Sequence, residues 1–197
     1  RYVDIEKQLK VRTHSYEKTL AGIERFVIGL GKKILISNAL GELCEIFKTS
    51  DEKSVLFFWV YAIGYTLQIY FDFSGYSDMA MGLGKMFNIE LPRNFISPYK
   101  ACSVKDLWQR WHITLTRFFT QYVYIPLGGS RKGRTRMLIN IFVVFLLSGL
   151  WHGAGWTYIT WGVIQGILVV WDNISIVGVK GEKSKKPPKL LMPRWLG

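Results

Sequence analysis

The sequence predicts an all-α fold class, namely a polytopic membrane protein fragment with short, broken and interfacial helices. Two long uncharged runs predict membrane segments, and basic clusters lie between them, as is typical of membrane proteins. The 197 residues are 49% apolar and only 20% charged, which argues against a disordered chain. A nucleic-acid-binding protein would concentrate its basic charge on a soluble module, so we expect no nucleic-acid partner.

The first uncharged run predicts one membrane-spanning helix. Residues 54–71 are 18 consecutive residues without a charged side chain, and Lys53 and Asp72 bound them. A helix needs about 20 apolar residues to cross the hydrocarbon core, with a lower limit near 17. Two acids, Asp72 and Asp78, are therefore expected at the end of this span.

The second uncharged run predicts a helical hairpin. Residues 137–171 hold no Asp, Glu, Lys or Arg over 35 positions, and one straight helix of that length would measure about 52 Å. Because the hydrocarbon core is only about 30 Å thick, the run must fold back, and three glycines within residues 148–156 indicate where. Basic clusters flank both ends, which places both on the cytoplasmic side. Each arm would hold about 15 residues and reach about 22 Å, so the turn would lie within the bilayer.

Within residues 1–53 the sequence predicts an amphipathic helix on the protein or at the membrane interface, because apolar residues recur at helical spacing. These residues are Ile23, Phe26, Val27, Leu30 and Ile34. A second helix is predicted over residues 106–119, with Trp108 and His112 on one face. We therefore divide the chain into amphipathic or interfacial helices (1–53), a membrane-embedded core (54–172) and a basic tail or truncated connector (173–197).

The distribution of charge and the spacing of the cysteines bear on partners and metal binding. Residues 1–53 carry ten basic and eight acidic groups, whereas residues 54–197 carry sixteen and six, so the more apolar part is also the more cationic one. Cys44 and Cys102 lack the spacing of a zinc site, so we expect free thiols and no metal. The chain begins with Arg1 and shows no signal-peptide pattern, which indicates an excised fragment.

His152 is the foremost catalytic candidate. An ionisable group inside an apolar membrane run usually faces a cavity or pathway, and a neutral imidazole can act as a general base. The alternative is a buried histidine bonded to a backbone carbonyl. The glycine-broken backbone and the nearby tryptophans favour the functional interpretation, since broken helices at membrane depth typically line cavities.

His112 follows Trp111 and could assist proton transfer or orient a substrate, or simply pack at the interface. His14 lies among charged and polar residues, which indicates a surface position.

Asp72 and Asp78 could bind cations, orient a histidine or cap a helix. A serine nucleophile is disfavoured, since the G-x-S-x-G pattern is absent. Residues 128–133 lack the G-x-x-x-x-G-K-[ST] pattern of nucleotide-binding loops. A turn with basic side chains on the cytoplasmic side accounts for them, and contact of these bases with the phosphates of a coenzyme is a weaker alternative.

Five motifs follow one another at specific separations. They are Tyr70-Phe71-Asp72-Phe73-Ser74-Gly75-Tyr76-Ser77-Asp78, Leu91-Pro92-Arg93-Asn94-Phe95, Trp108-Gln109-Arg110-Trp111-His112-Ile113, Tyr124-Ile125-Pro126-Leu127-Gly128-Gly129 and Ser148-Gly149-Leu150-Trp151-His152-Gly153-Ala154. Together they resemble the membrane-bound O-acyltransferases, most of all the branch of alginate O-acetyltransferase, with the teichoic-acid D-alanyl transfer protein as a cousin. The resemblance is strong over residues 54–172 and loose over residues 1–53.

The resemblance implies a polytopic fold around a tunnel, with the acyl donor entering from the cytoplasm and the hydroxyl acceptor outside. It also implies that His152 is the essential histidine and His112 the second one. The residues that we expect along the substrate tunnel are Trp108, Trp111, Ser148, Trp151, Asp72 and Asp78. The chain departs from the family at Thr120-Gln121, where Arg-Asp is common, and at Gln165, where a histidine is common.

The expected function is transfer of an acetyl group from a cytoplasmic thioester donor, acetyl-CoA or an acyl carrier, to hydroxyls of a cell-surface polysaccharide. We expect no tightly bound cofactor. The expected partners are the lipid bilayer, a donor or carrier protein, and a polysaccharide or an external acyl-transfer protein. The expected location is the inner cell membrane, crossed several times. The alternatives are a transporter or acyl channel with Asp72, Asp78 and His152 as its polar pathway, and a basic membrane scaffold.

Overall fold

A computed structural model describes residues 2–10, 15–51 and 54–179 of the chain, and within those ranges it contains helices and no strand. The helices in chain order are α1 (Tyr2–Lys10), α2 (Tyr16–Gly31), η1 (Lys32–Ser37), α3 (Asn38–Thr49), α4 (Val55–Met86), η2 (Pro98–Lys100), α5 (Val104–Arg110), α6 (Ile113–Phe119), η3 (Thr120–Tyr124), α7 (Arg134–His152) and α8 (Trp156–Val179). The predicted all-α class is thereby confirmed. The helices form two compact units, Arg1–Ile96 with Trp111–Thr114, and Ser97–Arg110 with Leu115–Gly197. The predicted basic tail lies outside the described residues from position 180 onward.

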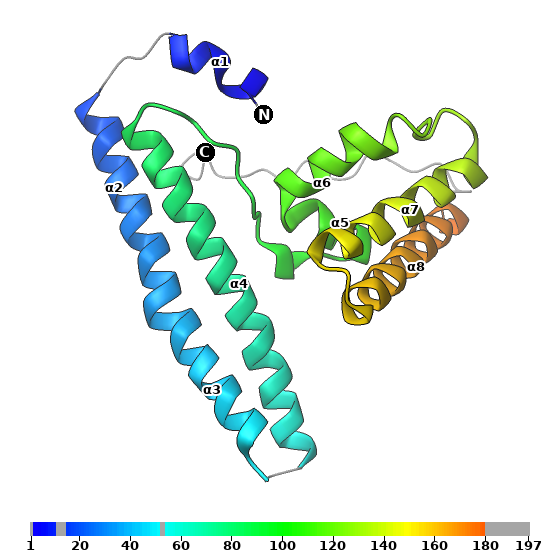
Figure 1. Ribbon diagram of the computed structural model, residues 1–197, viewed down its shortest axis with the longest axis horizontal. Helices are drawn as coiled ribbons and strands as arrows, with labels where there is room; N and C mark the ends of the chain where they lie inside the picture. The colour runs from blue at the N-terminus through cyan, green and yellow to red at the C-terminus, as the bar shows by residue number, and fades with distance from the viewer. Residues whose placement is uncertain (1, 11–14, 52–53, 180–197) are drawn as a thin grey trace. The chain divides into compact units, whose positions relative to one another are not determined.

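The first unit is built on two long antiparallel rods. One rod is the continuous run of α2, η1 and α3, and the other is α4 (Figure 1). The backbone amide of Phe57 donates to the Ser54 hydroxyl at 3.3 Å, which caps α4 where the uncharged run begins. However, α4 continues without a break to Met86. Neither Asp72 nor Asp78 therefore caps an end of α4, and where the membrane span ends along this helix stays a prediction.

The two rods approach closely at pairs of glycines. Gly22 and Gly29 on α2 are seven residues apart, as are Gly75 and Gly82 on α4. A Cβ atom on Gly29 would lie 2.6 Å from the Gly75 carbonyl oxygen, and one on Gly82 would lie 2.6 Å from the Gly22 oxygen. Small residues of this kind let two membrane helices pack backbone against backbone. Packing of this kind, rather than a layer of large side chains, therefore holds the rods together.

Most apolar residues of the predicted amphipathic helix are exposed, whereas Phe26 is half-buried. Val27 is 57% exposed and Ile34 is 52% exposed, whereas Gly22 and Gly29 are buried. Most of that face therefore does not pack on the described part of the protein. An apolar outside with polar groups turned inward is the arrangement that suits contact with lipid.

Two of the described helices, α4 and α7, are long and apolar enough to cross a membrane. Only 6% of the most apolar window of α4 and 17% of that of α7 is buried. The core helix of a soluble protein would be largely covered by its neighbours, so these exposed apolar surfaces support the membrane assignment.

The second unit contains the predicted hairpin. Helices α7 and α8 run antiparallel, and the chain turns through residues 153–155, as the glycines predicted (Figure 1). A Cβ atom on Gly149 would lie 2.5 Å from the Tyr158 carbonyl oxygen, so here too the helices meet at a glycine. The arms are longer than the predicted 15 residues, at 19 for α7 and 24 for α8, because α7 begins inside the basic flank and α8 continues past Asp172.

The predicted single helix over residues 106–119 is wrong. Helix α5 ends at Arg110 and α6 begins at Ile113. Between them His112 has φ +45°, which no α-helical residue adopts. Trp108 and His112 therefore do not share one helix face.

Asp106 stabilises the start of α5 through two hydrogen bonds. Its Oδ1 accepts from Arg110 Nε at 2.8 Å and its Oδ2 accepts from the Cys102 amide at 3.2 Å. The hydrogen bond from Arg110 lowers the pKa of the Asp106 carboxyl below its ordinary value, against the opposing effect of partial burial.

We expect this lowered pKa to make the start of α5 sensitive to acid. A carboxyl with a lowered folded-state pKa stabilises the fold above its unfolded pKa, near 3.9, and loses this contribution as the pH falls through the folded value. The effect should stay below about 1 kcal/mol, since the pair is partly exposed. Hydrogen exchange of the Cys102 amide, corrected for its intrinsic rate, should speed up below pH of about 4. An Asp106→Asn variant with the same acid response would contradict this account.

Candidate active site

His152 is the last residue of α7 and lies at the turn of the hairpin, with its side chain exposed. Three aromatic rings surround the imidazole: Trp151 at 5.0 Å between centroids, Trp161 at 5.4 Å and Tyr158 at 6.4 Å. The Tyr158 ring is nearly parallel to the imidazole, at 19°, and the two indoles meet it edge to face. The imidazole is thus held in place by aromatic contacts and is still open to a reactant.

Two of the expected tunnel residues lie close to this aromatic group. The Trp108 ring is 5.5 Å from the Trp161 ring, and its Nε1 donates to Gln165 Oε1 at 3.2 Å. Ser148 is buried one turn before His152 on α7. The second unit therefore brings together Trp108, Ser148, Trp151 and His152.

The sequence reasoning missed two members of this group, Tyr158 and Trp161, and named Gln165 only as a departure from the family. Tyr158, Trp161 and Gln165 follow one another on α8 at intervals of three and four residues, which puts them on one helix face. That spacing was visible in the sequence and could have identified them. Gln165, where the family often has histidine, holds the indole of Trp108 in this chain.

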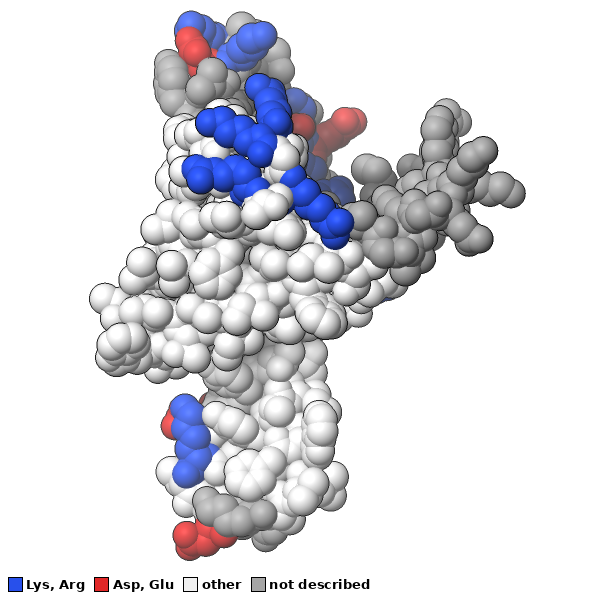
Figure 2. All heavy atoms as spheres, turned by 90° about the vertical axis from the view of Figure 1, so that its right-hand side faces the viewer, with Lys and Arg blue, Asp and Glu red and all other residues white. Residues whose placement is uncertain are grey.

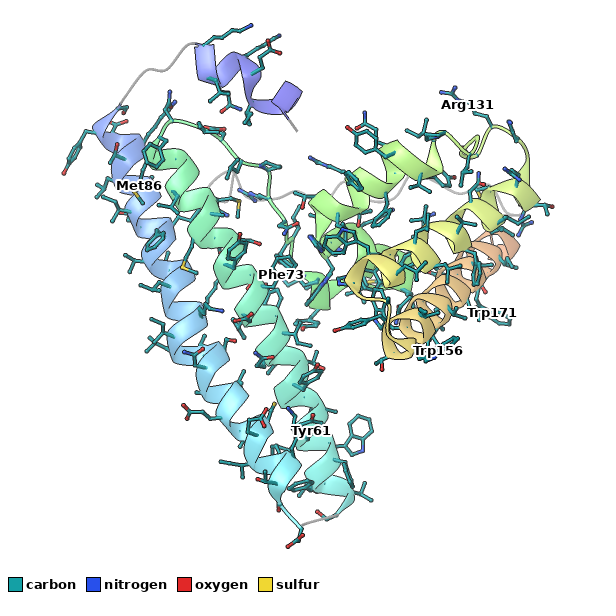
Figure 3. All side chains as sticks on the ribbon, viewed as in Figure 1. Tyr61, Phe73, Met86, Arg131, Trp156 and Trp171 are labelled. Carbon is teal, nitrogen blue, oxygen red and sulfur yellow. The ribbon has the colours of Figure 1, made fainter. Side chains whose placement is uncertain are left out.

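His112 lies in the first unit, half-buried in a second aromatic cluster. Its ring meets the Phe73 ring edge to face at 4.7 Å, and Phe73 packs against Phe95 at 5.1 Å. Trp111 joins the same cluster through Phe95, with centroids 5.0 Å apart. Phe73 belongs to α4, so this helix provides the surface on which the imidazole rests (Figure 3).

Asp72 and Asp78 are paired with bases from the other rod. Asp78 accepts from Arg25 Nη2 at 3.0 Å and from Lys32 Nζ at 2.6 Å. Asp72 forms an ion pair with Lys33 and accepts from the Ser37 hydroxyl at 3.4 Å. These pairs explain why two acids are tolerated in the middle of α4, since each charge is matched across the interface. Their assignment to a substrate tunnel stays a prediction.

Removing the Asp78 carboxylate should weaken the contact between the rods. The Asp78 side chain is only 15% exposed and forms ion pairs with both Arg25 and Lys32. Asp78→Asn therefore leaves these two cations close together without an anion between them. We expect a loss of about 1–2 kcal/mol, discounted because both bases keep some contact with solvent. The thermal unfolding midpoint of the purified full-length protein measures it.

Two further variants control this experiment. Asp51→Asn changes an exposed acid and should leave the midpoint unchanged. Adding Lys32→Met to Asp78→Asn removes the excess positive charge and should restore part of the loss. An Asp78→Asn protein as stable as the wild type would show that the pairing contributes nothing.

The loop before α7 is strongly basic, and Arg131, Lys132, Arg134 and Arg136 are all exposed. Figure 2 shows basic side chains gathered at one end of the second unit above a surface without charge, and Figure 3 shows Arg131 pointing outward. The buried Asn140 anchors the loop, since its Nδ2 donates to the Gly129 carbonyl at 3.0 Å. A fixed basic end on an apolar hairpin is the pattern of a cytoplasmic membrane boundary.

No group of three or more His, Cys, Asp or Glu side chains that could hold a metal ion occurs among the described residues. Cys44 is buried and Cys102 is exposed, and both are free thiols, as predicted.

The comparisons with known proteins decide the family. The sequence model of the membrane-bound O-acyltransferase family matches residues 1–185. The chain belongs to the membrane-bound O-acyltransferase family. The expected resemblance is thereby confirmed.

Three relatives show where the chain stands among the membrane-bound O-acyltransferases. A peptidoglycan O-acetyltransferase of Helicobacter pylori is 47% identical over 78% of this chain and 29% of its own length. A probable alginate O-acetylase, AlgI, of Pseudomonas aeruginosa is 42% identical over all of this chain and 36% of its own length. A teichoic acid D-alanyltransferase of Bacillus subtilis is 28% identical over 88% of this chain and 46% of its own length. The chain thus spans about a third to a half of the length of these relatives.

Proposed function

We propose that the full-length protein is an O-acyltransferase that moves an acyl group, in the simplest case acetyl, from a thioester to hydroxyl groups of an envelope polysaccharide. Family membership supports the reaction class. The names of the relatives support the acceptor, since they refer to peptidoglycan, alginate and teichoic acid. More of these names refer to acetyl than to alanyl transfer, which favours acetyl.

The observation that carries the proposal is the position of His152. A general base must reach the proton that it removes, and this imidazole lies exposed at the turn of an apolar hairpin. The surrounding rings of Trp151, Tyr158 and Trp161 fix its direction without covering it. The low access of water that we expect at membrane depth would limit hydrolysis of the donor.

The proposed reaction begins at this imidazole. The unprotonated ring nitrogen of His152 takes the proton of the acceptor hydroxyl while the hydroxyl oxygen attacks the thioester carbonyl carbon. A carbon–oxygen bond forms, and the carbon–sulfur bond then breaks. The leaving thiolate takes the proton from the imidazolium, which returns His152 to its starting state. Holding donor and acceptor next to each other contributes a further entropic advantage.

The remaining assignments accompany this mechanism as parts of the same proposal. His112 shapes the donor side or relays a proton, with Trp108, Trp111, Ser148 and Trp151 along the substrate tunnel. The donor is acetyl-CoA or an acyl carrier protein on the cytoplasmic side, and no cofactor is held tightly. The protein crosses the inner membrane several times, and the acceptor is a polysaccharide or an external acyl-transfer protein.

The test is a donor-to-acceptor balance in a strain that lacks its own copy of the gene. The full-length protein should restore alkali-labile acetate on purified envelope polysaccharide, and membranes that contain it should consume labelled acetyl-thioester in step with ester formation. Substrate flux into vesicles without thioester consumption would overturn the proposal and support a transporter. Labelled acyl groups that cross the membrane without ester formation would instead indicate a donor channel for a separate transferase.

The transporter alternative has less support from the contacts in the first unit. A polar pathway through Asp72 and Asp78 needs carboxylates that can release their partners, whereas both are engaged by bases of the other rod. Such matched pairs are typical of a structural interface.

A further inference from the structure

Asn94 connects α4 to the segment that carries His112. Its Nδ2 donates to the Ser77 hydroxyl of α4 at 3.2 Å. Its Oδ1 accepts from both the amide and the hydroxyl of Thr114, at 3.2 and 2.9 Å, and its backbone carbonyl accepts from the Ile113 amide at 3.0 Å. One residue from the loop after α4 therefore makes four hydrogen bonds to positions 17–20 residues away.

Three of these bonds act at the start of α6. Ile113 and Thr114 are its first two residues, and amides at this position have no partner within their own helix. Asn94 supplies that partner from a distant segment, as an N-cap residue would do locally. Since Ser77 is buried in α4, the other end of the Asn94 side chain is held by a rigid element.

The residue directly before this cap is His112, whose φ of +45° is rarely adopted by residues other than glycine. The sequence around it has the periodicity of one continuous helix over residues 106–119. Some contact from outside must therefore impose the break, and the bonds of Asn94 to Ile113 and Thr114 lie immediately after it. The break turns the imidazole onto Phe73, with 4.7 Å between ring centroids.

We propose that Asn94 is a positioning residue that holds the backbone break at His112 and thereby aims its imidazole; this inference rests on the role proposed for His112 in acyl transfer. An amide suits the task because it donates to Ser77 and accepts from Thr114 at the same time. Alanine can do neither, whereas aspartate keeps the acceptor that caps α6.

The first experiment is a double-mutant cycle in the full-length protein at matched membrane abundance. Asn94→Ala should lower acyl transfer by about 10- to 100-fold, the range expected when a reacting group is misplaced. Asn94→Asp should keep most of the activity, and Asn94→Ala combined with His112→Ala should be no slower than His112→Ala alone. Asn38→Ala, which removes an exposed amide on α3, is the matched control and should behave as the wild type.

The second experiment reads the position of His112 without activity. Labelling with diethyl pyrocarbonate, followed by mass spectrometry of the peptide that contains His112, should change in rate in Asn94→Ala and not in Asn38→Ala. Ser77→Ala removes only the bond to Nδ2 and should change the rate less. These milder variants keep the test available if Asn94→Ala fails to accumulate.

Each outcome assigns the failure to one proposal. Wild-type transfer by Asn94→Ala, or a double variant slowed by the product of the two single effects, would overturn the positioning role. Unchanged labelling of His112 in both Asn94→Ala and Ser77→Ala would overturn it as well. Wild-type transfer by His112→Ala would instead refute the proposed role of His112, and with it the catalytic consequence of Asn94.

Discussion

Replacing His152 by alanine is expected to reduce acyl transfer by about 10²- to 10⁴-fold, the contribution of a general base. The variant removes the only group at the hairpin turn that we assign to proton removal, while the rings of Trp151, Tyr158 and Trp161 remain in place. Glutamine should be nearly as inactive, because an amide can form hydrogen bonds but cannot take up a proton near neutral pH. Alkali-labile acetate on envelope polysaccharide, at matched membrane abundance, measures both variants.

His14→Ala is the matched control, since the sequence gives this histidine no place near the motifs, and it should keep wild-type turnover. Comparable unfolding midpoints for the wild type and His152→Ala would exclude a loss through misfolding. Wild-type transfer by His152→Ala would remove the proposed base, and loss of activity in His14→Ala to the same extent would show that the assay does not distinguish site from surface.

The largest expected effect on stability comes from a single methyl group on α2. In Gly29→Ala the new Cβ would lie 2.6 Å from the Gly75 carbonyl oxygen and 2.7 Å from the Met79 amide nitrogen. Both contacts are backbone atoms of α4, which cannot rotate away as a side chain could. The rods must therefore separate, and we expect a loss of about 3 kcal/mol, at the upper end of overpacking effects. The thermal unfolding midpoint of the purified protein should fall by several degrees.

Gly31→Ala tests whether this loss is specific to the contact. Gly31 lies two residues further along the same helix in helical conformation, and a Cβ there would meet nothing within 4 Å. The variant should be as stable as the wild type or up to about 1 kcal/mol more stable, because alanine is the better helix former. Equal behaviour of Gly29→Ala and Gly31→Ala would show that the two rods do not pack through these glycines.

The candidate site illustrates what a pattern of residues can and cannot predict. Its motif identified His152, and the glycines around it located the turn, because a helix break depends on a few adjacent residues. The rings that surround it, from Tyr158 and Trp161, lay in the same uncharged run, but only the packing of α8 on α7 gave them a role. The spacing on α8 could have identified these residues, but it could not predict the hydrogen bond from Trp108 to Gln165, since 57 positions separate the two.

The acids of α4 also show that contacts between distant segments cannot be predicted from local sequence. Asp72 was expected to end a span, since charges usually bound apolar runs. The helix instead continues through Asp72, whose carboxylate contacts Lys33 and Ser37 of η1 across the interface. The sequence of α4 alone does not indicate that Lys33 of the opposite rod lies next to Asp72.

The sequence by itself determined the all-helical class, the uncharged runs, the hairpin turn, the basic flank and the family, since each depends on composition or on neighbouring residues. Only the tertiary structure decided that α4 runs on through its acids, that the rods meet at glycines, and that the helix expected over residues 106–119 breaks at His112. The physical reason is that ion pairs, close backbone contacts and the hydrogen bonds of Asn94 join segments far apart in the chain, and their energies outweigh local helical preference.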